Sequence, residues 1–433
     1  MRICLTLAAA TVAAAALAAD NWPGFRGPNG DGTSDAKTLV AKWSETENVR
    51  WKTAIHGKGW ASPVVWSEQV WMTTADEVRG GKSAPTPKTG GAKGAVEKVT
   101  FFAVCADRKT GKITHDIPLA AEDNPAFCID FNSYASPTPV VEEGRLYAHF
   151  GSHGTWCLDT ATGKVLWERK DLKCDHFRGP GSSPVLFQNL LVLIFDGFDQ
   201  QYVAALDKAT GRTAWRKDRN IKYTTDNGDY KKAYATARVI EVNGKPQLVA
   251  PSAECTIAYD PTTGDELWRF QHLKKSTMNV AAPPVAGHGL TYLVSGHPSQ
   301  LMALKQGVSG TVPKDAVAWE TDKGVPTRPS LLLAGDLLFM VNDGGVVSCL
   351  DAKTGKPYWS ERLNGQYTAS PVLAGGLIYF PNEIGKTTVL KAAKEFETVA
   401  VNELDAGCMA SPAVAGDALL LRTKTHLYSL GTK

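Results

Sequence analysis

The sequence lacks three features that would each point to a definite class of protein. Beyond residue 17 no stretch approaches the roughly eighteen continuous apolar residues that cross a bilayer, so no further membrane-spanning helix is expected. The formal net charge is only +3, so general attraction to polyanions is not expected and we predict no nucleic-acid partner. There is no Gly-x-Ser-x-Gly motif, so nothing supports a serine hydrolase.

Cysteine is scarce and is not arranged as in known metal or haem sites. The sequence has no Cys-x-x-Cys-His motif and no zinc-type spacing, and of its eight cysteines one falls in the expected signal peptide. The remaining odd number leaves at least one without a partner in the chain. Cys105, Cys157 and Cys349 each precede the aspartate of a repeated turn by two residues, a position expected in the core. Cys128 and Cys174 lie in loops around the second repeat and could pair in an oxidising compartment.

The N-terminus is typical of an export signal. Arg2 precedes an apolar run at residues 3–17, and Ala16-Leu17-Ala18 is a small-x-small cleavage site, so we predict a signal peptide over residues 1–18. Cys4 lies too early in this run to carry a lipid after cleavage. We therefore expect a periplasmic or secreted protein without a lipid anchor.

A short motif that opens a strand recurs eight times. Each copy is a tripeptide such as Ala-Ser-Pro followed by apolar residues and a turn, and the 40 glycines and 24 prolines fit many short strands. The third residues of the eight copies are Pro63, Pro137, Pro184, Ala237, Pro283, Pro329, Pro371 and Pro412. Proline fits a strand that lines a central channel, because an edge position needs no N–H. Repeats of about forty to fifty residues indicate a propeller or a solenoid.

A second motif sets a tryptophan eight residues after the aspartate of an Asp-x-x-Thr-Gly turn. The clear copies are Asp159 with Trp167, Asp207 with Trp215, Asp260 with Trp268, and Asp351 with Trp359. Thr-Gly supplies the positive φ of a tight hairpin, and the aspartate accepts N–H groups of the turn. The tryptophan then falls on the outermost strand of each unit, where we expect it to pack against the neighbouring unit.

The last repeat lacks an outer strand, and a candidate for it lies near the start of the chain at residues 48–52. We therefore predict an all-β fold, an eight-bladed β-propeller of four-stranded antiparallel blades, closed by pairing of this N-terminal strand with the C-terminal blade. The expected organisation is an extension at residues 19–47 and a single domain at residues 48–433. The first repeat is longer than the others because of a basic, Gly-rich stretch at residues 79–98, expected to be a surface loop.

The two faces of such a ring differ in their chemistry. Turns between the first and second strands and between the third and fourth are short, whereas the remaining loops and the connections between blades are long and rich in polar and aromatic residues. We call the second side the loop-rich face and predict that it binds a small molecule, a glycan or a protein, in a monomer. The candidate ligand-binding residues are His153, Asp175, His176, Arg178, Asp196, Asp199, Glu254, Arg328, Asn342 and Gln366. The alternative is that these loops are polar only because they are solvated.

Metal binding stays undetermined at this stage. Oxygen ligands of the kind that calcium prefers are available on this face, although their spacing matches no calcium loop. They are Asp196, Asp199, Glu254, Asn342 and Asp343. His149 and His153 are four residues apart, which brings two side chains together on a helix but not on a strand.

The strand and turn motifs together resemble the pyrroloquinoline quinone (PQQ)-type propeller repeat, over about Val49 to Leu430. The stretch from Cys157 to Trp167 has the Leu-Asp-x-x-Thr-Gly-x-x-x-Trp form of this repeat. The opening Trp22-Pro23-Gly24-Phe25-Arg26-Gly27-Pro28 is similar to the start of exported bacterial proteins of this class.

This family contains both enzymes and a scaffold, so the resemblance implies two functions. Its quinone-dependent alcohol dehydrogenases hold PQQ with a vicinal disulfide, a stacking tryptophan, a calcium ion and an aspartate base, and this chain has no adjacent cysteine pair to carry over. Its lipid-anchored outer-membrane assembly scaffold needs a lipidation cysteine that is also absent here. We therefore predict a non-catalytic binding or interaction module, with a divergent alcohol or sugar dehydrogenase that uses PQQ and calcium as the alternative.

Overall fold

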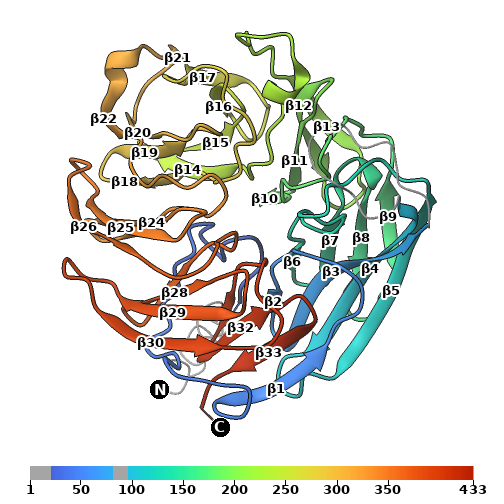
Figure 1. Cartoon of the computed structure of the whole chain (residues 1–433). Helices are drawn as coiled ribbons and strands as arrows, with labels where there is room; N and C mark the ends of the chain where they lie inside the picture. The colour runs from blue at the N-terminus through green and yellow to red at the C-terminus, as the bar shows by residue number, and fades with distance from the viewer. Residues whose placement is uncertain (1–20, 81–95, 433) are drawn as a thin grey trace, which may run out of the picture.

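Eight antiparallel sheets stand around a common axis in the computed structural model, which describes residues 21–80 and 96–432 (Figure 1). Seven sheets have four strands, and the sheet of the fourth blade gains a fifth, parallel strand at its outer edge. The predicted eight-bladed propeller is confirmed. The predicted signal peptide at residues 1–18 lies outside the described residues, which themselves contain no helix with the length and apolar character needed to cross a bilayer.

The first four blades follow one another from the N-terminal side of the ring, each running outward from the axis. Blade 1 consists of β2 (Val64–Trp66), β3 (Gln69–Arg79), β4 (Val96–Asp107) and β5 (Ile113–Asp123). Blade 2 consists of β6 (Val140–Glu142), β7 (Arg145–His149), β8 (Thr155–Asp159) and β9 (Val165–Arg169). Blade 3 consists of β10 (Val185–Phe187), β11 (Leu190–Asp196), β12 (Gln201–Asp207) and β13 (Thr213–Asp218). Blade 4 consists of β14 (Arg238–Val242), β15 (Lys245–Pro251), β16 (Cys255–Tyr259), β17 (Glu266–Gln271) and the added β21 (Gly310–Thr311).

The last four blades complete the circle. Blade 5 consists of β18 (Val285–Gly287), β19 (Leu290–Val294), β20 (Leu301–Lys305) and β22 (Val317–Thr321). Blade 6 consists of β23 (Leu332–Ala334), β24 (Leu337–Val341), β25 (Val346–Asp351) and β26 (Pro357–Arg362). Blade 7 consists of β27 (Val372–Ala374), β28 (Leu377–Pro381), β29 (Lys386–Lys391) and β30 (Thr398–Glu403). Blade 8 consists of β31 (Ala413–Ala415), β32 (Ala418–Arg422), β33 (His426–Leu430) and β1 (Val49–Ala54), and short 3-10 turns occur at Gly151–His153, Gly228–Tyr230 and Lys314–Ala316.

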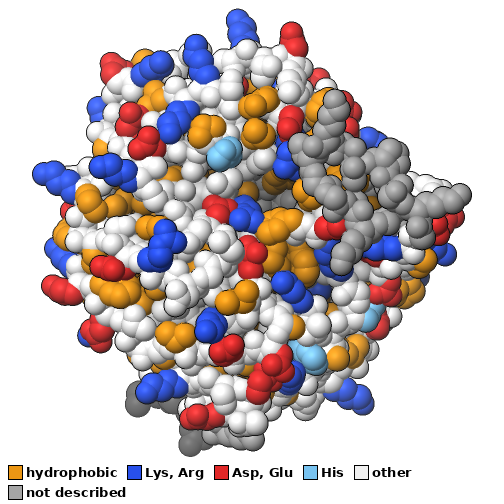
Figure 2. Space-filling model, in the orientation of Figure 1, with side chains coloured by type: hydrophobic (Ala, Val, Ile, Leu, Met, Phe, Trp, Pro, Cys, Tyr) orange, Lys and Arg blue, Asp and Glu red, His pale blue; other side chains and the backbone are white. Residues whose placement is uncertain are grey.

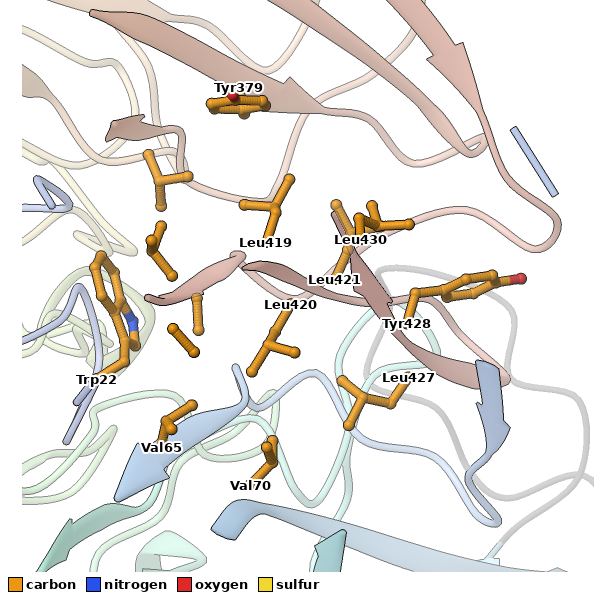
Figure 3. Close-up of a cluster of buried hydrophobic side chains, with 14 of the residues drawn as sticks. Trp22, Val65, Val70, Tyr379, Leu419, Leu420, Leu421, Leu427, Tyr428 and Leu430 are labelled. Carbon is orange, nitrogen blue, oxygen red and sulfur yellow. The ribbon is translucent and has the colours of Figure 1, made fainter. Parts of the chain in front are cut away.

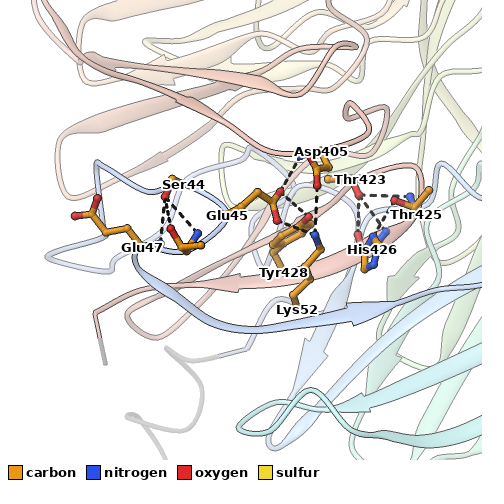
Figure 4. Close-up of polar contacts among 10 residues, drawn as sticks. Ser44, Glu45, Glu47, Lys52, Asp405, Thr423, Thr425, His426 and Tyr428 are labelled. Carbon is orange, nitrogen blue, oxygen red and sulfur yellow. Dashed lines mark hydrogen bonds and ion pairs between the residues drawn. The ribbon is translucent and has the colours of Figure 1, made fainter.

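The two ends of the chain are joined in blade 8, as the sequence predicts. Strand β1 pairs antiparallel with β33, and Trp51 lies opposite Ser429. Beside this pair, the Glu45 carboxylate accepts hydrogen bonds from Lys52 and from the Tyr428 hydroxyl, at 2.7 and 2.9 Å (Figure 4). These contacts attach the N-terminal strand to the C-terminal blade, so blade 8 is completed by residues from both ends of the ring.

The core is divided among the interfaces between blades, and the largest cluster lies where the ring closes. It combines Val65 and Val70 of blade 1 with Leu420 and Leu427 of blade 8 and with Trp22 of the N-terminal extension (Figure 3). All five side chains are at most 1% exposed. Hydrophobic burial therefore holds the closing blades together in the same way as it holds consecutive ones.

The turn motif explains how each blade is attached to the next. The indole of Trp167 on blade 2 donates to the carbonyl of Lys208 in the turn of blade 3 at 3.0 Å. Gly211 of the same turn has a φ of +73°, and a Cβ placed there would lie 2.7 Å from the indole. Glycine at position 211 therefore allows the positive φ of the turn and leaves room for the indole of Trp167. The same pairing joins Trp51 to Gly111, Trp215 to Gly264 and Trp319 to Gly355.

In three of the eight units, the inner strand begins later than the opening motif predicts. The inner strands of blades 2, 5 and 6 begin after Pro139, Pro284 and Leu331, one or two residues later than the predicted copies ending at Pro137, Pro283 and Pro329. The connections in these units contain additional prolines that imitate the motif. The number of blades is unaffected by this shift.

The predicted loop at residues 79–98 contains strand at both ends. Strand β3 continues to Arg79 and β4 begins at Val96, so the hairpin of blade 1 is longer than those of the other blades. Residues 81–95 of this predicted loop lie outside the described residues. Toward the viewer in Figure 2, hydrophobic side chains gather near the middle of the ring, with charged side chains of both signs around them.

A segment of the N-terminal extension fills one end of the channel. Residues 22–32, which we call the axial plug, pair with blade 1 through Trp22 and Val65 and with blade 2 through the carbonyl of Pro23 and the N–H of Val141. On the opposite side, Leu373 of blade 7 donates to the carbonyl of Gly32. The axial plug therefore packs against blades on both sides of the ring.

Arg26 attaches the axial plug to two more points of the ring. Its guanidinium donates to the carbonyls of Leu331 before blade 6, Pro371 before blade 7, and Asp31 within the plug. The side chain is 2% exposed, and burial lowers its pKa to about 9. Because these carbonyls have no solvent to bind, the arginine supplies the donors that the inner strands would otherwise lack.

Candidate functional site

A cavity of about 590 Å³ lies on the axis above the plug, and all eight blades contribute to its wall. Phe25 of the plug forms its floor and also borders a second cavity of about 240 Å³ below. The upper cavity is surrounded by connections that enter the inner strands and by loops between second and third strands, including those with His297 and Asp343. It therefore lies on the loop-rich face, where the sequence predicts a binding site.

The side chains of the wall follow a simple pattern along the chain. In every blade, the residue four positions before the first residue of the inner strand lines the cavity. These residues are Trp60, Ser136, Gly181, Tyr234, Ala281, Arg328, Thr368 and Met409. Because alternate residues of extended backbone point to the same side, the next such residue often lines the cavity too, as Ser62 does after Trp60.

A series of hydroxyl groups joins the inner ends of neighbouring blades. The N–H of Ser62 donates to the hydroxyl of Thr138, Thr138 N–H to Ser183, and Ser183 N–H to Thr236, each at 3.0 Å. In blades 6 to 8, Ser370 accepts from Ser330 N–H and itself donates its N–H to Ser411. The oxygens of Thr138, Ser183 and Thr236 act only as acceptors within the described structure, so their O–H groups can donate into the cavity.

Arg178 is the cationic group of the cavity with the fewest partners. Its guanidinium donates no hydrogen bond within the described residues, its buried Nε has no partner, and the nearest carboxylate oxygen, on Asp229, is 3.6 Å away. Asp229 is also the partner of Lys232, whose ammonium reaches the Oδ1 of Asn279 at 2.7 Å. Both Arg178 and Asn279 line the cavity. This wall therefore presents unused N–H donors to a ligand.

Arg328 occupies a different environment on the far side of the axis. It donates to Asp343 and lies 3.7 Å from the Oε1 of Glu383. Its guanidinium is also 4.4 Å from the ring centroid of Phe131, a residue of the connection between blades 1 and 2. The Arg328 side chain thus reaches across the mouth of the cavity and is already paired on both sides.

Aromatic side chains supply the apolar part of the wall. Trp60, Phe131 and Tyr234 line the cavity, and the Trp60 indole donates to the Phe131 carbonyl at 3.0 Å. The hydroxyl of Tyr234 donates to the carbonyl of His176, which fixes the orientation of its ring. A planar or apolar body between these rings would gain contact area at little entropic cost.

The structure brings only two of the predicted site residues, Arg178 and Arg328, into the cavity. Four others, His153, His176, Asp175 and Asp199, form contacts within and between blades 1 to 3. His153 is bonded to Glu122 at 2.7 Å, and His176 is half-buried, accepts the N–H of Ser152, and has a pKa lowered to about 3 by desolvation. The backbone N–H of Asp175 donates to the carboxylate of Asp199.

The remaining predicted residues also have structural partners. Asp196 forms a buried ion pair with Arg219, and Glu254 accepts the N–H groups of Thr224 and Ser276. The amide of Asn342 accepts N–H groups of its own turn, and Gln366 is exposed and bonded through its backbone carbonyl to Glu383. Their polarity is explained by these loop contacts. The cavity residues that the sequence analysis missed, such as Trp60, Tyr234 and Asn279, stand next to the inner strands, where the two-residue period identifies most of them.

The donor groups of the cavity do not fit PQQ with calcium. The described residues hold no group of three or more His, Cys, Asp and Glu side chains that could bind a metal ion. Among the described residues, Asp343 is the only carboxylate lining the cavity, and Arg328 already holds it. Cys128 and Cys174, a predicted disulfide, are both free, as are the other cysteines of the described residues. No disulfide platform for a quinone is present in this part of the chain.

Comparison with known proteins agrees with the fold. A family model described as outer membrane protein assembly factor BamB matches residues 81–217, 199–307 and 254–406, which together cover about three quarters of the chain. The structure of BamB from Moraxella catarrhalis superposes with a TM-score of 0.55 and 12% identity, covering 83% of this chain and 99% of that one. Quinohemoprotein alcohol dehydrogenase from Comamonas testosteroni gives 0.63 and 12%, covering 98% and 82%.

Two curated relatives are quinone-dependent enzymes. Quinohemoprotein alcohol dehydrogenase ADH-IIG of Pseudomonas putida is 26% identical over 154 residues, which are 34% of this chain and 20% of the relative. The 1-butanol dehydrogenase (quinone) of Thauera butanivorans is 25% identical over 222 residues, 45% of this chain and 33% of the relative. The matched part thus spans a third or less of the length of either relative.

Proposed function

Because the chain belongs to the PQQ-like β-propeller family of outer membrane protein assembly factor BamB, and its axial cavity holds an arginine, Arg178, that donates no hydrogen bond within the described residues, we propose a binding function. The protein is a non-catalytic module that binds a small organic molecule with an anionic group. We favour a small molecule over a glycan or a protein because the site is a cavity with a floor.

Arg178 is the observation on which this proposal rests. An arginine that faces a cavity normally pairs its planar N–H groups with a carboxylate or phosphate. Here the Arg178 guanidinium makes only a 3.6 Å contact with Asp229, while Asn279 beside it keeps its amide N–H groups unused. A bound carboxylate would satisfy both residues, and its apolar body would lie against Tyr234 and Phe131.

The same cavity offers little for catalysis by a quinone enzyme. A dehydrogenase needs a free base, and Asp343, the one carboxylate that the described residues place in the wall, is bonded to Arg328 and to the N–H of Thr327. The alternative of a divergent PQQ- and calcium-dependent alcohol or sugar dehydrogenase is supported by the names of the curated relatives. It is tested separately below.

Binding is tested by titrating 3-phenylpropionate into the purified protein in a calorimeter. We expect saturable binding of one molecule per chain, weakened about tenfold or more by Arg178→Met, because a hydrogen-bonded ion pair is lost. Arg212→Met is the matched control, since Arg212 is an exposed residue of a turn on the opposite face. Absence of saturable binding, or equal weakening by both variants, contradicts the proposal.

Catalysis is tested by adding PQQ and calcium chloride and measuring dye-linked oxidation of ethanol and 1-butanol. We expect no turnover above that of PQQ and calcium alone. A protein-bound quinone spectrum together with turnover would replace the proposal with the dehydrogenase alternative.

We also propose that the protein is exported, on the basis of the charged and apolar N-terminal residues of the sequence. Expression of the full chain followed by fractionation and mass measurement is expected to give a periplasmic or secreted product that starts near Ala19. An uncleaved cytoplasmic product would contradict this part of the proposal.

A further inference from the structure

The charges on the two sides of the axial cavity do not balance. On the side of blades 3 to 5, two cations, Arg178 and Lys232, share the single carboxylate of Asp229. The side chain of Lys232 is completely buried. Within the described structure, no carboxylate other than Asp229 forms an ion pair with Arg178 or Lys232. This wall therefore has one positive charge in excess.

The contacts of Lys232 require it to be charged. Its Nζ donates to the carbonyl and the carboxylate of Asp229 and to the Oδ1 of Asn279, and all three of these groups are acceptors. A neutral amine has two N–H donors, whereas an ammonium has three. Burial lowers the pKa of Lys232, and the adjacent Asp229 opposes this effect. The faces of Phe177 and Tyr234, at 5.4 and 6.0 Å, add to the stability of the ammonium.

The other wall has the opposite excess. Arg328 pairs with two carboxylates, Asp343 and Glu383, whose side chains are 22% and 18% exposed. Glu383 also accepts the hydroxyl of Thr368, which lines the cavity. Lys424 is exposed and donates to the backbone carbonyl of Glu383, so solvent screens its charge.

These two walls face each other across the axis. Arg178 lies in the connection that leads into blade 3, whereas Glu383 lies in the loop between β28 and β29 of blade 7. Blade 7 is four positions from blade 3 in a ring of eight. Arg328 extends over Phe131, which belongs to the connection into blade 2, and this contact confirms that the residues before blade 6 reach the other side. The cavity is thus positive at one side, negative at the other and aromatic between them.

We propose that the ligand of this cavity is a zwitterion with separated ends, namely a short peptide with free termini. This inference rests on the proposed binding function and makes it more specific. The terminal carboxylate binds Arg178 and Asn279, and the terminal ammonium binds at Asp343, which lines the cavity and lies with Glu383 around Arg328. The side chains of the peptide pack against Trp60 and Tyr234. Each end then removes the excess charge of the wall that it meets.

The test compares peptides that differ only at their ends. Alanyl-phenylalanyl-alanine, its N-acetylated form and its C-terminal amide are titrated into the protein at low and at moderate salt. We expect the free peptide to bind, and each capped form to bind about tenfold more weakly, since each loses one charged hydrogen-bonded pair. Equal binding of the free and the acetylated peptide, or of the free peptide and the amide, overturns the proposal.

Two conservative variants assign each end to its wall. In Arg178→Met the free peptide and the amide should bind equally, while the preference for a free N-terminus is kept. In Glu383→Gln the free and the acetylated peptide should become equal, while the preference for a free C-terminus is kept. Glu361→Gln, an exposed residue of β26, is the control and should change neither preference.

The outcome separates this inference from the proposed function. If 3-phenylpropionate binds through Arg178 and none of the peptides binds, the anion site stands and the peptide proposal is wrong. If neither probe binds, both proposals fall. Binding of the free peptide that survives both variants would also contradict the peptide proposal, because it would occur outside this cavity.

Discussion

The outer part of the ring and its axis are built on opposite principles. On the outside, one contact is repeated: a tryptophan on the last strand of a blade packs on the turn glycine of the next, as Trp167 does on Gly211. On the axis, a single segment without symmetry, residues 22–32, makes different contacts with five blades. The repeat provides a stable frame, and the unrepeated residues determine what the frame encloses.

This comparison shows where a chemical function can arise in such a fold. Eight equal blades alone would give a channel with eight equivalent walls. The axial plug closes one end, and the residues before the inner strands differ from blade to blade, so that Arg178 and Arg328 meet different partners. The charge difference between the two walls exists only because the inner positions have lost the symmetry of the outer ones.

The largest effect is expected from breaking the attachment of the axial plug. Arg26→Met removes the donors for the buried carbonyls of Leu331 and Pro371 and for the half-buried carbonyl of Asp31. Unsatisfied buried carbonyls should lower the free energy of unfolding by about 3–6 kcal/mol in total. Urea unfolding followed by tryptophan fluorescence measures this loss. Arg50→Met is the control, since Arg50 forms an exposed ion pair with Asp417 and should cost about 1 kcal/mol at most.

A second variant measures the repeated outer contact. Gly211→Ala introduces a Cβ that would lie 2.7 Å from the Trp167 indole, at a φ of +73°. The strained backbone and the overlap together should cost about 2–4 kcal/mol. Gly244 has the same φ but no atom within 4 Å of its Cβ position, so Gly244→Ala should show only the backbone part. Equal losses in the two variants would mean that the packing of the tryptophan on the turn contributes nothing.

The sequence predicted the outer frame well because the frame is repeated. Copies such as Asp159 with Trp167 and Asp207 with Trp215 confirm one another, and the β1 strand was found as the missing member of the set. The same reasoning failed at the axis. The predicted start of the inner strand is displaced by two residues at Pro137 and Pro329 and by one residue at Pro283, and the one-residue displacement exchanges the residues that face the channel with those that face away.

The candidate site could be predicted only in part for a physical reason. The cavity lies on the loop-rich face, and two of the predicted site residues, Arg178 and Arg328, line it. Polarity alone could not separate them from Asp196 or Glu254, which are equally polar but satisfy neighbouring loops. The floor formed by Phe25 could not be foreseen, because no repeat indicates where an unrepeated segment will lie.

A third prediction concerns the pH dependence of the loop-rich side of blades 2 and 3. Burial lowers the pKa of His149 to about 3, so this side chain stays neutral in the folded state, whereas the unfolded chain binds a proton below about pH 6.5. Stability is therefore lost as the pH falls from about 6.5 toward 3, and at pH 5 His149 should account for about 2 kcal/mol of the loss. Unfolding in urea at pH 7 and pH 5 measures it. The difference between the two pH values should shrink by this amount in His149→Phe.

The smallest expected effect tests whether the hydroxyl groups at the axis join the blades or only face the cavity. Ser183 accepts the N–H of Thr138 from the neighbouring blade, whereas the hydroxyl of Ser62 has no hydrogen-bond partner within the described residues. Ser183→Ala should therefore lower the free energy of unfolding by about 1 kcal/mol, the usual contribution of one hydrogen bond. Ser62→Ala, which removes a hydroxyl from the same cavity, should change it by only a few tenths. Equal stabilities would show that the inner ends of the blades are held by packing alone, and the asymmetric wall would then owe nothing to these hydroxyls beyond the donors that they offer a ligand.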